Sequence, residues 1–540
     1  MQPGYKMVGE LDEQAIKNQE RMIRQLLTHT NKYTGKRYAD DPALVMTAIN
    51  NESTLFFLGD WGQGELKSPY HRKLLGQLFN EWLKARIGDR AALEGRWAAK
   101  AEDKGRLGLQ GSEDPASGTV QPIMDFSDRS KEYLKYTRQR VQDNYRFFYD
   151  IENKYQKRML AVIRGAGYKG LVTHTNHWLD VPIHQYVNAT TDWNDTHVYW
   201  AHPSVGYQYK AGTTFEPKPT IREPDSLIAR IAARRVKGMP HLISEWNSCH
   251  PLWRNDAQLM MAGYSGLHNW SALQYGLGGN PISEQDQSKA KLDNVFELVF
   301  QASTLALWPA TATMVLRRDV KEAPQDAYRP LSHPEVFDPA SRVKLPIGLP
   351  FVTKSGMAFT GDKAVEPGFG DLLAKYVSGS SARSVTGELI TDWKRGTFTV
   401  DTPRSQAAVG FFDQQPVALS NLTASLKNAF VTVVATSLDG AALSDSKRVL
   451  ITAVGNTINT DMELSANGAS FRKGGKSPIL VEPMLGSVTL KGLKKAGTPK
   501  VYFLNMSGKR RGEVPADVSG DALRFELLAK YKGAHYEIVR

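Results

Sequence analysis

Short apolar segments that end abruptly in polar or aromatic residues alternate with amphipathic helical segments along the first half of the chain. The apolar segments read ALVMTAINNES, GLVTHTNHW, THVYWAHP, MPHLISEWNSCHP and LHNWSALQYG. Apolar residues recur at helical spacing within residues 11–27, 145–162, 228–235 and 256–263. This alternation predicts an α/β fold with a parallel sheet wrapped by helices. Polar residues at the strand ends favour a (β/α)-barrel, which keeps its active site there.

The second half of the chain has a different sequence pattern. A chain of 540 residues is too long for one hydrophobic core, because single cores stop growing at about 250 to 300 residues. After the barrel segment, 1–318, comes a proline-rich connector, 319–375. Residues 376–540 hold β-branched runs such as FVTVVATSLDG, RVLITAVG and KVYFLNMSG, separated by Gly and Asp turns. We therefore expect an all-β sandwich as the last domain.

Composition excludes two classes of protein. No apolar run approaches the roughly 18 residues that would span a bilayer, so no membrane association is expected. The formal charge is +12, but the sequence has no zinc-ligand spacing, RNP-like motif or basic helix, so we expect no nucleic-acid partner. An acidic polysaccharide near the basic stretch 472–511 is a weaker alternative to solvated strand edges.

Two glutamates stand at the ends of predicted strands. Glu52 ends INNES and Glu245 lies in LISEWN. Taken singly, each is most simply a surface residue. Together, each after an apolar strand and with helices between them, they match a retaining glycosidase, which needs two carboxyl groups about 5 to 5.5 Å apart. One group is protonated to assist the leaving group, and the other is ionised to attack the anomeric carbon.

At this point the sequence resembles clan A of the glycoside hydrolases, and within it the cellulase-related, family 5-like members. The resemblance rests on INNES, LVTHTNHW, THVYWAHP, LISEWN and NWSALQY, with further support from LLTHTNKYTGKRYADDPA and FNEWLKARIGDRAALEGRW. It implies a (β/α)8 TIM-type barrel in which these five segments are strands four to eight. It also implies that strands one to three have no counterpart here, since only about fifty residues precede strand four and each unit takes roughly 30.

The resemblance assigns roles to several residues. Glu52 is the expected general acid/base and Glu245 the expected nucleophile, while Asn51 is expected to bind the sugar 2-hydroxyl. Tyr199 or His197 is expected to donate to Glu245, with ordinary strand packing as the alternative.

Further substrate contacts are expected from residues at other strand ends. Trp270 is expected to stack on a sugar ring, although a position in the core is an equal alternative. The remaining expected substrate contacts are His174, Asn176, Trp200 and Trp246. A metal site at His174 and His177 is the weaker alternative, because no third ligand stands at suggestive spacing, so neither a metal nor a cofactor is expected.

The sequence therefore predicts a retaining hydrolase of O-glycosidic, β-linked bonds whose partner is a poly- or oligosaccharide. A catalytically silent carbohydrate-binding or scaffold protein and a transglycosylase stay open as alternatives. The first 30 residues show no export signal. The resemblance implies a secreted or periplasmic location, and the oligomeric state is not predicted.

Overall fold

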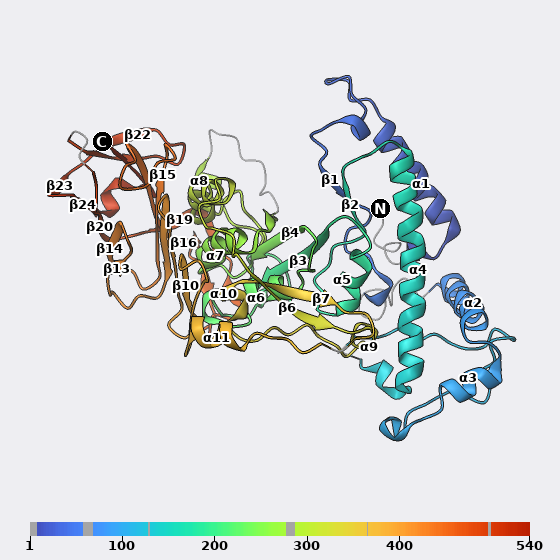
Figure 1. The fold of residues 1–540 in the computed structure, drawn as a ribbon. Coiled ribbons are helices and arrows are strands. Elements are labelled where there is room, and N and C mark those ends of the chain that lie inside the picture. Colours follow the sequence, from blue (N-terminus) through green and yellow to red (C-terminus); the bar gives the residue numbers. More distant parts are fainter. Residues whose placement is uncertain (1–7, 58–67, 128–129, 277–286, 364, 495–497) are drawn as a thin grey trace.

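The computed structural model describes residues 8–57, 68–127, 130–276, 287–363, 365–494 and 498–540. A helical part at the N-terminal end is followed by a part with parallel strands, and an antiparallel β-sandwich forms the other end of the molecule (Figure 1). None of the helices in these ranges is long and apolar enough to cross a membrane.

The N-terminal part contains two helices predicted from apolar spacing. They are α1 (Glu13–Thr28) and the long α4 (Arg138–Gly165), and the shorter α2 (Pro69–Arg86) and α3 (Arg90–Arg96) lie near the outer end of α4 (Figure 1). The side chain of Asp12 caps α1 by accepting from the N–H of Ala15 at 2.9 Å.

All five predicted parallel strands are present. They are β1 (Met46–Ala48), β2 (Leu171–Thr173), β3 (Asn194–Trp200), β4 (His241–Ser248) and β5 (Ser271–Gln274). β1 pairs with β2, and β3, β4 and β5 pair in that order, all in parallel.

The expected barrel is not closed within the described residues. The five strands form a two-stranded and a three-stranded sheet, because no ladder joins β2 to β3. Beyond the end of β2, the carbonyl of His177 accepts from the N–H of His197 at 3.1 Å and from the hydroxyl of Thr196 at 3.1 Å. The two sheets therefore meet where the strand ends approach each other.

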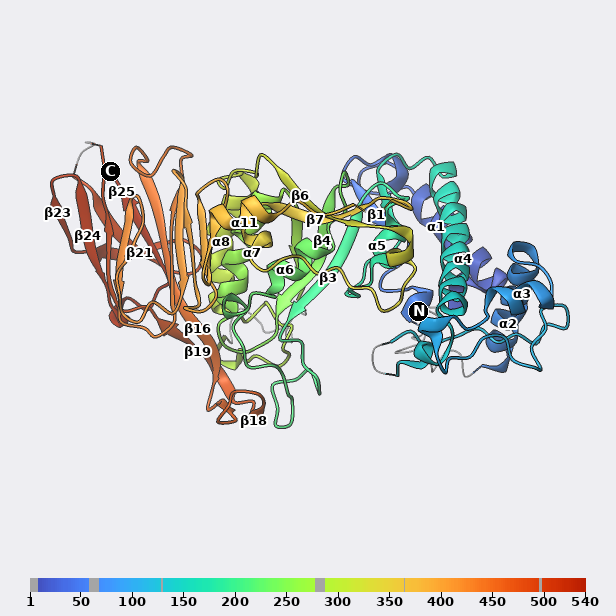
Figure 2. The ribbon, with the colours of Figure 1, turned by 60° about the horizontal axis from the view of Figure 1, so that its bottom comes forward.

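Helices cover the parallel strands. They are α5 (Pro182–Asn188), α6 (Leu227–Ala233), α7 (Arg254–His268) and α8 (Ala302–Leu316), of which α6 and α7 match predicted segments. α7 is buried along nearly its whole length, because the strands lie on one side and the sandwich on the other (Figure 2).

The proline-rich segment 319–375 has regular structure that the sequence did not predict. β6 (Asp326–Leu331) and β7 (Lys354–Phe359) pair in parallel, and α9 (His333–Val336), α10 (Leu349–Val352) and α11 (Gly370–Tyr376) lie beside them. The N–H of Met357 donates to the carbonyl of Arg235 at 2.8 Å, which ties β7 to the end of α6.

The predicted β-sandwich is confirmed. An eleven-stranded antiparallel sheet packs against a five-stranded one. The large sheet contains β8 (Val377–Ser378), β9 (Ser381–Arg383), β10 (Leu389–Asp392), β11 (Thr397–Asp401), β12 (Ser405–Gly410), β15 (Val431–Ser437), β16 (Arg448–Thr460), β19 (Lys476–Pro483), β21 (Lys500–Leu504), β22 (Arg510–Val514) and β25 (His535–Val539). The small sheet contains β13 (Val417–Ala418), β14 (Leu422–Leu426), β20 (Gly486–Leu490), β23 (Ala516–Ser519) and β24 (Ala522–Leu527), and β17 (Glu463–Leu464) pairs with β18 (Phe471–Lys473).

Both faces of the large sheet are buried at its central strands β12 and β15. Side chains alternate across a strand, so in β12 Ala407 and Val409 face the core around α7, whereas Ala408 faces the small sheet. Gly263 of α7 allows close approach, since an added Cβ would lie 2.8 Å from the ring of Phe398. The sandwich therefore completes the core beneath α7 and α8.

Candidate active site

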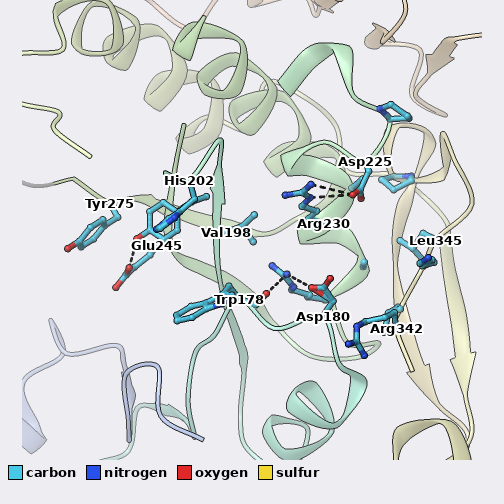
Figure 3. Close-up of a pocket in the computed structure, with 18 of the residues that line it drawn as sticks. Trp178, Asp180, Val198, His202, Asp225, Arg230, Glu245, Tyr275, Arg342 and Leu345 are labelled. Carbon is cyan, nitrogen blue, oxygen red and sulfur yellow. Dashed lines mark hydrogen bonds and ion pairs between the residues drawn. The ribbon is translucent and has the colours of Figure 1, made fainter. Parts of the chain in front are cut away.

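A cleft of about 1230 Å³ opens at the carboxyl ends of β3, β4 and β5. Figure 3 shows Glu245, His202 and Tyr275 grouped at one end and Arg230, Asp225 and Arg342 toward the other, with Val198 between them. Both predicted catalytic residues, Glu52 and Glu245, line this cleft, and so does Tyr199.

The register of two neighbouring strands positions Glu245. In the parallel pair β3–β4, His197 lies opposite Glu245 and Tyr199 opposite Asn247. The hydroxyl of Tyr199 donates to Oε2 of Glu245 at 2.5 Å. Burial, and then the hydrogen bond with Glu245, raise the pKa of Tyr199, so the phenol keeps its proton. A phenol that donates to a carboxylate stabilises its ionised form.

Glu52 lies in a turn shortly after β1. Its φ of 50° is in the left-handed region, which costs a non-glycine residue about 1 to 3 kcal/mol. The amide of Asn176 helps to hold this turn, because its Oδ1 accepts from the backbone N–H of Glu52 at 3.0 Å. The Glu52 side chain is 19% exposed, so it is partly sheltered yet reachable from the cleft.

His197 lies between the two carboxylates. Its Nδ1 is 2.6 Å from Oε1 of Glu52 and 3.5 Å from Oε2 of Glu245. Oxygens of Glu52 and Glu245 lie within 4.8 Å of each other and of the imidazole. This upper bound lies well below the roughly 6.5 to 9.5 Å of inverting glycosidases and is compatible with the short separation of about 5 to 5.5 Å in retaining ones.

A buried chain of hydrogen bonds holds the imidazole of His197 in place. The Ser244 hydroxyl hydrogen-bonds to the carboxylate of Asp195, and the Ser244 oxygen lies 3.0 Å from Nε2 of His197. Nε2 of the ring therefore faces Ser244, and Nδ1 faces Glu52. Burial raises the pKa of Asp195, whose carboxylate also accepts from Asn176 and from the backbone N–H of Ser244.

The environments of the two glutamates therefore differ. Glu245 accepts a hydrogen bond from the Tyr199 hydroxyl, whereas Glu52 contacts Nδ1 of His197. Different environments can divide an acid from a nucleophile in a carboxylate pair.

The other predicted substrate-binding residues differ in burial and position. Asn51 is exposed and is not among the described residues that line the cleft. Asn176 is 5% exposed and supports Glu52 from behind, while His174 is fully buried among Glu10 and Glu152.

Three predicted tryptophans are core side chains here. Trp200 and Trp246 follow cleft residues by one position, so the alternation of a strand directs them into the core, where they are 3% and 4% exposed. Trp270 stacks on His268, and its indole donates to Ser265 at 2.8 Å. The core alternative for Trp270 is the arrangement found.

Several residues that line the cleft were not predicted. Tyr275 directly follows the end of β5, whereas Trp270 precedes its start, so the rule of active sites at carboxyl ends would have selected the tyrosine. Trp178 offers a second aromatic side chain. The predicted connector also reaches the cleft through residues 342–347, and no local pattern indicates that contact.

Glu52, His197 and Glu245 also have the residue types of a cation site. Their inward atoms already take part in hydrogen bonds, however: Oε1 of Glu52 with His197, and Oε2 of Glu245 with Tyr199. The geometry thus accounts for these groups without a metal.

Comparisons with known proteins give a distant match. No protein-family model matches the sequence, and no curated protein matches it. Among solved structures, the chain is similar to β-galactosidase from the psychrophilic Marinomonas ef1, with a TM-score of 0.33 and 10% identity over 96% of this chain and 84% of that one. It is also similar to β-galactosidase from Bacillus circulans sp. alkalophilus, with a TM-score of 0.36 and 11% identity over 96% and 83% of the two chains. Similarity at this level assigns no activity to the chain.

Proposed function

We propose that this protein is a retaining glycoside hydrolase that cleaves β-linked O-glycosidic bonds of a poly- or oligosaccharide. The observation that carries the proposal is the convergence of Glu52 and Glu245 in one cleft, with oxygens within 4.8 Å. The clan A resemblance supports the same assignment. We take the parallel strands to correspond to strands four to eight of its barrel.

In the first step, Glu245 attacks the anomeric carbon while Glu52 protonates the leaving oxygen. The proton of Glu52 moves to the glycosidic oxygen as the bond breaks. Tyr199 holds the Glu245 carboxylate by a hydrogen bond until the attack, and the product of this step is a glycosyl ester on Glu245. In the second step Glu52 acts as base on a water that hydrolyses the ester, which restores both residues.

The cleft offers contacts for the sugar rings. Trp178 and Tyr275 present aromatic side chains, whose faces suit the apolar faces of pyranoses. Asp180, Asp225 and Arg230 offer polar groups farther along the cleft. Rings bound on both sides of the two glutamates place the scissile bond between them.

The proposal is tested by hydrolysis of a panel of aryl β-glycosides. Glu245→Ala should lose turnover, whereas Glu52→Ala should lose about 10²- to 10⁴-fold on poor leaving groups and much less on activated ones, which need no protonation. Glu94→Ala, an exposed glutamate on α3, is the matched control and should turn over like the parent.

Two outcomes would contradict the proposal. Turnover that survives Glu245→Ala would remove that residue as nucleophile. Saccharide binding without turnover on any glycoside would favour the silent carbohydrate-binding alternative.

A further inference from the structure

A second cluster of two glutamates and one histidine lies in the protein interior, outside the cleft. Glu10 ends the 3-10 turn Val8–Glu10, Glu152 lies on α4, and His174 follows the end of β2. They are 3%, 1% and 0% exposed. Each offers a ligand atom within 4.8 Å of the other two, and Nε2 of His174 lies 3.6 Å from Oε2 of Glu152.

The polar atoms of this cluster are not satisfied by the protein. Oε2 of Glu10 and both ring nitrogens of His174 are buried and have no hydrogen-bond partner among the described residues. Buried polar atoms of this kind are rare and call for a physical explanation. The side chains of Glu10, Glu152 and His174 converge, so these unpartnered atoms lie close to the carboxylate of Glu152.

The carboxylates of this cluster have no basic side chain beside them in the part of the chain that the structure describes. No lysine or arginine there pairs with Glu10 or Glu152. Buried carboxylates are normally paired with a cation or coordinate a metal.

We propose that Glu10, Glu152 and His174 form a binding site for one divalent first-row transition-metal ion, with Zn²⁺ as its representative. Two carboxylates and one imidazole suit such an ion, and a charge of +2 balances the two carboxylates. Ligand bonds of about 2.0 to 2.2 Å would draw the three side chains slightly together. This site is separate from the proposed glycosidase chemistry and does not depend on it.

The ion would brace the turn that carries Glu52. Ser53 donates to Oε1 of Glu10 at 3.3 Å, and Asn50 donates to the same oxygen at 3.2 Å. Oε1 of Glu152 accepts from the hydroxyl of Thr54 at 2.5 Å. The residues on either side of Glu52 thus hold the outer oxygens of the proposed ligands, an arrangement typical of the outer shell of a metal site.

The test is Zn²⁺ binding by the full chain after treatment with a chelator. Equilibrium dialysis followed by elemental analysis should find one Zn²⁺ per chain, and Zn²⁺ should raise the melting temperature. Glu10→Gln keeps the shape of the side chain but removes a ligand charge, so affinity should fall by more than the roughly 10- to 100-fold that outer-shell changes cost. Glu245→Gln, the matched change in the other glutamate–histidine cluster, should bind like the parent.

The metal-free proteins provide the folding control. Without Zn²⁺, Glu10→Gln should melt at or above the temperature of the parent, because the neutral amide has the shape of the carboxyl group and no charge to bury. If this variant fails to fold, His174→Gln, which removes the imidazole ligand, takes its place with the same expected loss of Zn²⁺. The proposal is overturned if the parent binds no Zn²⁺, if Glu10→Gln or His174→Gln binds it as tightly as the parent, or if Glu245→Gln alone loses it.

Discussion

At the scale of single residues, different hydrogen-bond partners distinguish the two glutamates. Glu245 accepts from the Tyr199 hydroxyl, and Glu52 contacts Nδ1 of His197, whose Nε2 faces Ser244. Neither distinction depends on the identity of the sugar. The pair Tyr199 and His197, two residues apart on β3, supplies both partners from the same face of one strand.

Tyr199→Phe removes the donor to Glu245 without changing the ring. Tyr199 positions the Glu245 carboxylate for attack, and we expect its loss to lower kcat roughly 10- to 150-fold, which corresponds to the about 1.5 to 3 kcal/mol of a hydrogen bond to a charged group. KM for a small aryl glycoside should change little. Steady-state kinetics check this, with Tyr207→Phe as a control at a partly exposed tyrosine of the same cleft. An unchanged kcat would show that the Tyr199 contact does not contribute to the reaction.

At the scale of elements, α7 carries a buried acid that makes stability depend on pH. Burial raises the pKa of Asp256 to about 7, although its carboxylate accepts from the backbone N–H groups of Ile221 and Ala257. The folded state therefore keeps a proton that the unfolded chain releases near pH 4. Stability should fall as the pH rises from about 4 to about 7, and stay lower above that range.

Asp256→Asn removes this titration and keeps an acceptor for the backbone. The parent should lose a few kcal/mol of unfolding free energy between pH 4 and 7 from this group, and the variant should lack that contribution. Urea unfolding at several pH values measures the difference. Parallel pH profiles for the two proteins would contradict the assignment.

The secondary-structure elements also show which features of the fold could be predicted from sequence patterns. Five strands and four helices were predicted because apolar periodicity is local and each element buries one face. β6 was missed because Pro330 argues against a strand, yet β6 pairs on one side only, with β7, where a proline is tolerated. A closed barrel would require β2 to pair with β3. Such long-range pairing cannot be deduced from a local sequence pattern, and the two strands form separate sheets.

The candidate site was predictable to a similar extent. Strand ends identified Glu52 and Glu245, and the resemblance added His197 and Tyr199; the structure brings these four together. Trp200 and Trp246 were assigned to the cleft without regard to strand alternation, which buries them. His174 lacked a third ligand in the sequence because Glu10 and Glu152 lie on distant segments that only the fold unites.

At the scale of the whole molecule, the sandwich is part of the support of the site. The large sheet packs one face against α7 and α8 and the other against the small sheet, so its strands belong to two cores at once. Tyr264 of α7 hydrogen-bonds to Thr391 of β10 at 2.6 Å and stacks on Phe398 of β11. The two halves of the chain are therefore expected to unfold together.

Phe398→Ala tests this coupling. Phe398 is 1% exposed beneath α7, and truncating a buried phenylalanine costs about 3 to 5 kcal/mol. Far-UV circular dichroism and residual glycosidase activity should lose signal at the same, lower denaturant concentration. Separate transitions, with activity lost well before the β-sheet signal, would show that the halves are independent.

The central claim is that Glu245 forms a covalent bond to the sugar. The most direct measurement is mass spectrometry of the protein after reaction with a 2-deoxy-2-fluoro-β-glycoside that carries a good leaving group, chosen for a sugar the protein hydrolyses. The account predicts one added glycosyl mass, located on the peptide that contains Glu245 and absent from Glu245→Ala. Inactivation with the mass on another residue, or hydrolysis with inverted anomeric configuration and no adduct, would contradict it.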